Sequence, residues 1–169
     1  MKTSISLKNI MLPGFAFYQL FTLPSIIRRN RKNFSFCKTC NYNCLLENEY
    51  LYIIDKLYEK AINNYKKVLR QNPMCSLAWN NLSLIYYLSE NFTNAIESAK
   101  NVIMLNNSTL VLKFTYCNLG ILYFDKNKTR CAIQYLKKAN EIETENIYID
   151  LIAKALLILT FSHNQKNYT

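Results

Sequence analysis

The sequence predicts an all-α protein, and three observations support this prediction. The 169 residues include only 2 Gly and 3 Pro, too few for the turns of a many-stranded sandwich or barrel. An apolar fraction of 50%, with 14% aromatic residues, is enough to bury the core of one domain. From Leu45 onward, apolar residues recur at the spacing of helix faces. We therefore expect helices joined by short polar turns.

The positive charge of the chain is concentrated near its N-terminus. Residues 1–46 carry seven basic residues and no acidic residue, whereas residues 47–169 contribute only +3 of the net charge of +10. This distribution leaves the helical part nearly balanced, which argues against nucleic acid as its main partner. The basic cluster at residues 28–32 offers contacts to RNA phosphates, but it lacks an aromatic platform on which bases would stack.

The acid-free segment 1–41 contains an uncharged apolar stretch, residues 10–27, directly before this cluster. Three interpretations remain open: a membrane anchor or interfacial helix, an organellar targeting peptide, and a strip that packs on the fold. An anchor would contact a membrane through residues 10–32 and keep the helical part on its cytoplasmic, stromal or matrix side. Removal of a targeting peptide would instead leave a soluble organellar protein.

The helical part of the chain repeats. Residues 79–86 (WNNLSLIY) return thirty-seven residues later as residues 116–123 (YCNLGILY), and Ala95 corresponds to Ala132 by the same shift. A step of thirty-four residues back from Ala95 leads to Ala61. Three units over residues 42–145 follow, at about 42–75, 76–109 and 113–146, and a loop around 106–112 precedes the third unit.

These residues resemble the tetratricopeptide repeat, a helix–turn–helix with the signature Trp-x2-Leu-Gly-x2-Tyr, then Ala-x3-Phe, then Pro. The resemblance covers about residues 42–145 and implies two-helix units that stack into a solenoid, with small side chains where paired helices approach. The pattern departs from the signature at Asn48, Glu49 and Thr129. The signature positions of this chain are Trp79, Leu82, Tyr86, Ala95, Leu119, Gly120, Tyr123, Ala132, Ala61 and Pro73.

A capping helix is predicted at residues 147–161, where Asn146 provides an N-cap, and a tail follows at residues 162–169. This helix is apolar on nearly every side, although the last helix of a solenoid should have a polar face in water. We expect its apolar surface to be covered by residues 10–27, by a partner or by a second copy of the chain.

The resemblance also implies a concave groove that is lined by the first helix of each unit and holds a client protein. The second unit would contribute Leu77, Asn80, Asn81, Leu84, Tyr87 and Leu88. The third unit would contribute Phe114, Cys117, Asn118, Ile121, Phe124 and Asp125. The first unit would add Leu46, Tyr50, Ile53 and Ile54.

This predicted groove is apolar and aromatic. Leu46 and Phe114 occupy positions where family members that clamp acidic C-terminal peptides have Lys, so the resemblance does not extend to that clamp. Asn81 and Asn118 are similar to the asparagine ladder of other members, whose amides bond the main chain of an extended peptide. The alternative is that both are tolerated polar residues in a chain rich in Asn.

Residues with catalytic or metal-binding chemistry are few. His163 is the sole histidine, and no G-x-S-x-G, Walker or dinucleotide motif occurs, so we expect no enzyme activity and no cofactor. A weak candidate metal site, which lacks a fourth ligand, is formed by Cys37, Cys40 and Cys44. Cysteines within apolar helical stretches favour a reducing compartment over a disulfide framework; these are Cys75, Cys117 and Cys131.

These observations predict a non-catalytic interaction scaffold or assembly factor that binds an apolar or extended client segment. A short apolar N-terminus before three repeats is similar in architecture to small plastid assembly factors for photosystem I, which implies assembly of an organellar complex as an alternative. An RNA-associated organellar protein and a metal-carrying maturation factor are further alternatives. Self-association through the capping helix remains open.

Overall fold

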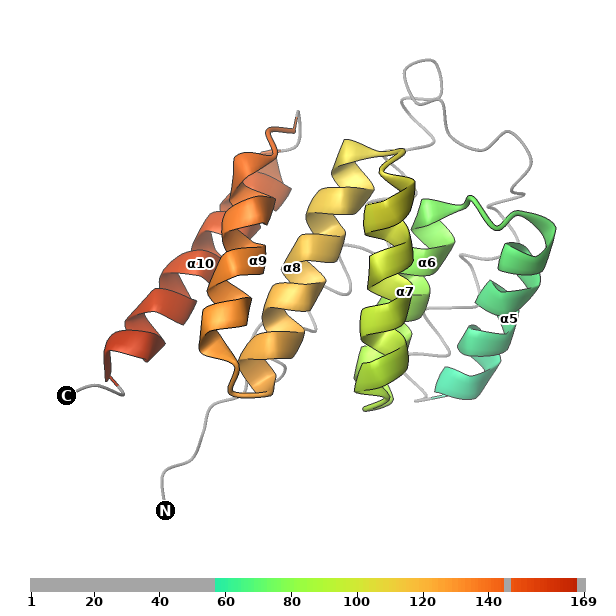
Figure 1. Cartoon of the computed structure of the whole chain (residues 1–169), viewed down its shortest axis with the longest axis horizontal. Helices are drawn as coiled ribbons and strands as arrows, with labels where there is room; N and C mark the ends of the chain where they lie inside the picture. Colours follow the sequence, from blue (N-terminus) through green and yellow to red (C-terminus); the bar gives the residue numbers. More distant parts are fainter. Residues whose placement is uncertain (1–56, 145–146, 167–169) are drawn as a thin grey trace. The chain divides into compact units, whose positions relative to one another are not determined.

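The described part of this protein is helical throughout. The computed structural model describes residues 57–144 and 147–166. Its elements are α5 (Tyr58–Gln71), α6 (Ser76–Leu88), α7 (Phe92–Leu105), α8 (Thr109–Asp125), α9 (Thr129–Glu141) and α10 (Ile147–Lys166) (Figure 1). No strand occurs among these residues, and the all-α prediction is confirmed. The N-terminal segment 1–41, the first helix of the first predicted unit and Asn146 lie outside the described residues.

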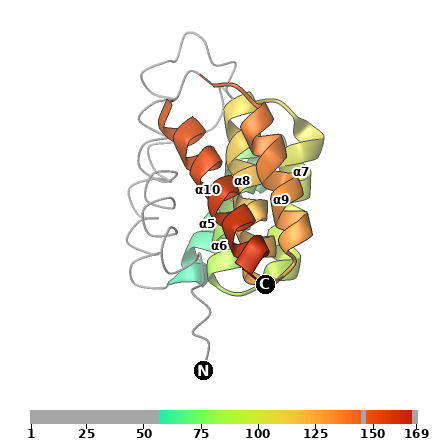
Figure 2. The same cartoon turned by 90° about the vertical axis from the view of Figure 1, so that its left-hand side faces the viewer.

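The described helices fall into two compact units, α5 to α7 and α8 to α10. In the α5–α7 unit, α6 packs against both α5 and α7 (Figure 1). In the α8–α10 unit, α8 packs against α9, while α10 packs mainly on α9 and also contacts α8 (Figure 2). The pairs α6–α7 and α8–α9 are the helical hairpins expected for the second and third repeats.

The first helix of each hairpin is buried around nearly its whole circumference. Eleven of the 13 residues of α6 and 12 of the 17 residues of α8 are buried. By contrast, α7 buries only Ala95, Ser98, Ala99 and Val102, at the spacing of one helix face. The second helix of a hairpin therefore meets its partner along a narrow stripe of mostly small side chains.

Close approach within each hairpin depends on one small residue of the first helix. Gly120 on α8 faces Leu136 on α9, and a β-carbon added at Gly120 would lie 2.5 Å from Leu136 Cγ. At the equivalent position of α6, Ser83 Oγ donates to the carbonyl oxygen of Ala95 on α7 at 2.8 Å. One hairpin thus omits the side chain, and the other uses a hydroxyl that bonds to the facing backbone.

Both hairpins turn with the same backbone geometry. The N–H of Asn91 donates to the carbonyl of Tyr86 at 2.8 Å, and the N–H of Lys128 donates to that of Tyr123 at 2.9 Å. Each bond closes a turn in which a left-handed residue ends the first helix, as in the Schellman motif. The left-handed residues are Glu90, with φ 63°, and Asn127, with φ 56°.

Helix α8 begins at Thr109, inside the predicted loop 106–112 and four residues before the predicted start of the third unit. The cause is Ser108, whose extended backbone and side-chain oxygen cap the helix by accepting the N–H of Val111 at 3.4 Å. The turn before α8 is therefore shorter than the sequence pattern indicated.

Helix α10 begins at Ile147, as predicted, but continues to Lys166 and includes part of the predicted tail. No Gly or Pro follows Phe161 to end it, and Ser162 Oγ donates to the carbonyl of Leu159 at 2.9 Å. Two of its apolar side chains are well exposed, Leu151 at 57% and Ile158 at 67%. Within the described ranges, no helix combines the length and hydropathy that a membrane span requires.

Candidate functional site

The residues predicted to line the groove from α6 follow one stripe of that helix, but they are not an open surface. Leu77, Leu84 and Tyr87 are each no more than 3% exposed, whereas Leu88, at the end of the stripe, is half-buried. The Tyr87 ring meets Phe92 at the start of α7, edge to face, with the centroids 6.1 Å apart. This stripe therefore contributes to the packed core of its unit.

The equivalent stripe of α8 has the same character. Phe114, Ile121 and Phe124 are buried, and Asp125, which corresponds to Leu88, is half-buried. Burial raises the pKa of the Cys117 thiol to about 12, although the nearby charge of Lys113 acts to lower it. The Cys117 thiol consequently stays protonated and unreactive at neutral pH.

Both amides predicted as a ladder, Asn81 and Asn118, are buried. Asn81 Nδ2 donates to the hydroxyl of Tyr65 on α5 at 2.9 Å, and Asn80 Nδ2 donates to Asn81 Oδ1 at 3.2 Å. Asn81 thus joins α6 to α5 inside the unit. The groove positions predicted for the first repeat lie outside the described residues; these are Leu46, Tyr50, Ile53 and Ile54.

The signature residues lie where the helices of each hairpin meet. Trp79 is half-buried, and its indole Nε1 donates to the carbonyl oxygen of the exposed Pro73 at 2.8 Å, so the first signature residue of the second repeat bonds to the last residue of the signature in the first. Tyr123 is half-buried as well. The other signature positions in the described ranges are buried, namely Ala61, Leu82, Tyr86, Ala95, Leu119, Gly120 and Ala132.

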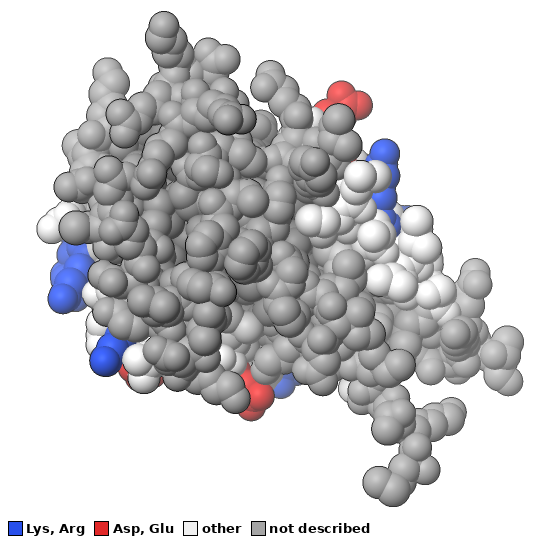
Figure 3. All heavy atoms as spheres, turned by 180° about the vertical axis from the view of Figure 1, so that it is seen from behind, with Lys and Arg blue, Asp and Glu red and all other residues white. Residues whose placement is uncertain are grey.

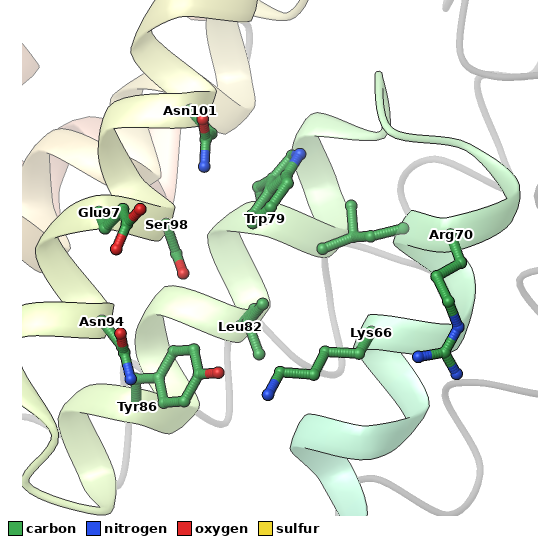
Figure 4. A pocket seen from close by; sticks show the side chains of 10 residues that line it. Lys66, Arg70, Trp79, Leu82, Tyr86, Asn94, Glu97, Ser98 and Asn101 are labelled. Atoms are coloured by element: carbon green, nitrogen blue, oxygen red, sulfur yellow. The ribbon is translucent and has the colours of Figure 1, made fainter.

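An open cavity of about 360 Å³ lies elsewhere, on the side of α6 where α5 and α7 flank it (Figure 4). Helix α5 contributes Lys66, Leu69 and Arg70, and α6 contributes Trp79, Leu82 and Tyr86. The α7 wall consists of Asn94, Glu97, Ser98 and Asn101. Its volume falls within the range of sites that take small ligands or a few side chains. All of these residues belong to the α5–α7 unit.

The cavity combines an apolar floor with polar walls. The apolar lining, called the floor below, consists of Leu69, Leu82 and the Trp79 ring. The exposed side chains of Lys66 and Arg70 line the cavity from α5 (Figure 4). The Lys66 ammonium lies 5.9 Å from the centroid of the Tyr86 ring, a cation–π arrangement. Arg70 and Glu97 have no ion-pair partner among the described residues. Charged groups at this cavity are therefore available to a ligand.

Seven cavity residues were not among the site residues predicted from the sequence: Lys66, Leu69, Arg70, Asn94, Glu97, Ser98 and Asn101. Their spacing held a partial signal, since Lys66 and Arg70 are four residues apart and Asn94 and Asn101 are seven apart on single helix faces. Nothing in the spacing indicated that these two faces flank the same space.

Metal-ligating side chains occur in the described ranges without forming the cluster that a metal site needs. No group of three or more His, Cys, Asp or Glu side chains there could hold a metal ion. The weak candidates Cys37, Cys40 and Cys44 lie outside those ranges. On the face shown in Figure 3, the visible Lys and Arg side chains of described residues stand in separate places, with acidic side chains also visible.

Comparison with known proteins matches the two complete hairpins. The model of the family described as tetratricopeptide repeat matches residues 77–109 and 115–146, which correspond to the second and third predicted units. A TPR repeat-containing protein of Methanocaldococcus jannaschii is 28% identical to this chain over 98 residues. The match covers 57% of this chain but only 17% of that relative, so the chain spans a small part of the relative's length.

Proposed function

Two stretches of this chain match the tetratricopeptide repeat, and we propose that the chain is a non-catalytic scaffold whose first helices hold an apolar or extended segment of a client protein. Solenoids of such repeats serve as protein-interaction scaffolds, because each repeat adds to an extended binding surface. The family is typically non-catalytic.

The observation that supports this proposal is the repeated stripe on α6 and α8. The thirty-seven-residue shift relates Leu77 to Phe114, Leu84 to Ile121 and Tyr87 to Phe124, so each hairpin places an apolar side chain at the same three positions. An apolar or extended segment of a client protein suits such a stripe, because burial of its apolar side chains drives association.

A client can bind only where side chains of the stripe are exposed. Its central side chains have almost no exposure, whereas Leu88 and Asp125 are half-buried at equivalent positions of the two hairpins. A client therefore contacts Leu88 and Asp125 first, and deeper contact requires the covered side chains to become accessible.

Photo-crosslinking at the accessible end of the stripe tests this function. A photo-reactive phenylalanine analogue is placed at Leu88 or Asp125 in the full chain, with matched positions at the exposed Lys100 on α7 and Arg130 on α9. We expect Leu88 and Asp125 each to crosslink to an apolar client segment, mapped by mass spectrometry. Equal yields at Lys100 and Arg130 would reject client binding by the first helices.

We also propose that the N-terminal segment attaches the protein to a membrane. The uncharged stretch 10–27 followed by the basic residues 28–32 supports membrane association with the repeats on the cytoplasmic, stromal or matrix side, in keeping with an assembly factor for a membrane complex. Fractionation with carbonate extraction tests it, because an integral anchor stays in the pellet. Release of an N-terminally shortened protein supports a cleaved targeting peptide, and salt-sensitive RNA binding supports the RNA-associated alternative.

A further inference from the structure

A small residue of α7, Ser98, lines the cavity between α5 and α7. Ser98 is 3% exposed and lines the cavity, and its hydroxyl has no hydrogen-bond partner among the described residues (Figure 4). A buried hydroxyl without a partner is costly, because water no longer satisfies it. The Ser98 hydroxyl is therefore a polar group that a ligand in the cavity can satisfy.

The other hairpin shows what a large side chain does at the same position. The thirty-seven-residue shift relates Ser98 to Tyr135, Trp79 to Tyr116 and Tyr86 to Tyr123. The Tyr135 ring stacks on Tyr123 with the centroids 5.3 Å apart and also lies 6.2 Å from the Tyr116 ring. In the α8–α9 hairpin an aromatic ring thus covers the surface that Ser98 leaves open in α6–α7.

The positive charges of the cavity lie on α5, whereas its carboxylate and amides lie on α7. On α5, Lys66 and Arg70 are four residues apart and present two positive charges, while α7 presents a single carboxylate, Glu97. Asn94 and Asn101 are seven residues apart on α7, about 10 Å along the helix axis. This distance equals about three residues of an extended chain. Amides at such a spacing can donate to and accept from the main chain of an extended peptide.

We propose that this cavity is a second docking site, distinct from the stripe on the first helices, for an extended partner segment that carries an apolar side chain beside a carboxylate. The apolar side chain lies on Leu69, Leu82 and the Trp79 ring. The carboxylate pairs with Lys66 and Arg70, and the main chain bonds to the amides of α7.

Charge disfavours two other occupants, the N-terminal segment of this chain and a second copy of it. Residues 1–46 of this chain carry seven basic and no acidic side chains, so Lys66 and Arg70 repel them. A second copy of the chain brings a net charge of +10 toward a cavity that already carries an excess of positive charge. An acidic and apolar segment of a different protein satisfies both the floor and the α5 wall.

Trp79 makes the test specific, since it is the one tryptophan of the chain and lines the cavity. Three acetylated and amidated octapeptides share a central Leu-Phe pair and differ only in flanking Asp, Asn or Lys residues. We expect the Asp peptide to shift the emission of Trp79 in the full chain in a saturable way. The Asn peptide should bind about tenfold more weakly, and the Lys peptide more weakly still.

Two sets of variants test whether the peptides bind at this cavity. The double variant Lys66→Gln/Arg70→Gln should bind the Asp peptide no better than the Asn peptide, whereas Lys67→Gln, an exposed lysine of α5 outside the cavity, should behave as the unmodified chain. Ser98→Tyr, which copies the residue of the other hairpin, should abolish binding of all three peptides with the helical circular dichroism signal retained. Ser98→Leu serves the same purpose if the tyrosine prevents folding.

Each contrary result overturns the proposal. An Asp peptide that leaves Trp79 emission unchanged rejects the site, and equal affinity for all three peptides rejects the assigned charge pairing. Binding that survives a folded variant with Ser98 enlarged rejects the location. Crosslinking at Leu88 and Asp125 is independent of these residues, so failure at the cavity leaves the proposed function standing.

Discussion

Lys113 on α8 forms an ion pair with Asp150 on α10, and its ammonium group also donates to the carbonyl oxygen of Ile142 at 2.6 Å. The Lys113 side chain is only 2% exposed, whereas that of Asp150 is 28% exposed. Thr144 Oγ1 donates to the same carboxylate oxygen at 2.9 Å. These contacts tie α10 to α8 across the connection that follows α9.

Removing either partner of this pair should have unequal effects. Asp150→Asn leaves the Lys113 ammonium buried without a countercharge, which should lower the free energy of unfolding by about 3 kcal/mol. Lys113→Met removes the buried charge itself and keeps the apolar stem, while water continues to solvate the partly exposed carboxylate, so the loss should be about 1 kcal/mol. Urea unfolding followed by circular dichroism measures both; a larger loss for Lys113→Met contradicts this account.

The pair also predicts how stability depends on pH. Burial by itself raises the pKa of Asp150, but hydrogen bonds from Lys113 and Thr144, with the charges of Lys113 and Lys154, place it below its ordinary value. A carboxylate with a lowered pKa in the fold stabilises fully above its unfolded pKa, about 3.9, and this stabilisation is lost as pH falls through the folded pKa. Thermal midpoints should fall less steeply below about pH 4 in Asp150→Asn than in the unmodified chain.

Gly120→Ala should destabilise the α8–α9 hairpin although alanine favours helices. The higher helix propensity contributes about 1 kcal/mol, whereas the new methyl would lie 2.5 Å from Leu136 Cγ and overpacking costs about 1–3 kcal/mol. We expect a net loss of about 1 kcal/mol in denaturant unfolding. Leu136→Ala should cost less in the Gly120→Ala background than alone, because the two side chains then compete for one space; additive losses would contradict the clash.

Glu90→Gly should stabilise the α6–α7 hairpin by about 1 kcal/mol, since Glu90 has φ 63° and glycine adopts this conformation without steric cost. Asn127→Gly is the matched change in the other turn, where φ is 56°. It should stabilise less, because asparagine tolerates the left-handed region. Glu90→Ala keeps the β-carbon and should give no gain. Denaturation midpoints compare the three variants, and an equal gain for Glu90→Ala would exclude backbone strain as the cause.

Much of the architecture was predictable from positions related by a constant shift. The equivalence of Trp79 with Tyr116 and of Ala95 with Ala132 located both complete hairpins, because a repeated fold requires the same side-chain sizes wherever paired helices cross. The start of α8 was less predictable: Ser108 caps the helix before its apolar pattern becomes regular.

The candidate site could be predicted only in part. Sequence spacing identified a stripe on α6 and α8, yet the structure buries Leu84 and Phe114 and leaves an open cavity on another side of α6. The residues of that cavity come from three helices, so the periodicity of one helix could not indicate it.

By itself, the sequence determined the class of the protein, its repeat period and the small residues at the helix crossings. These follow from periodicities within single helices and from comparison of one repeat with the next. Only the tertiary structure decided that Lys113 pairs with Asp150, thirty-seven residues away, and that Lys66 and Asn101 flank one cavity. Such contacts depend on how helices are placed against one another, which no local pattern records.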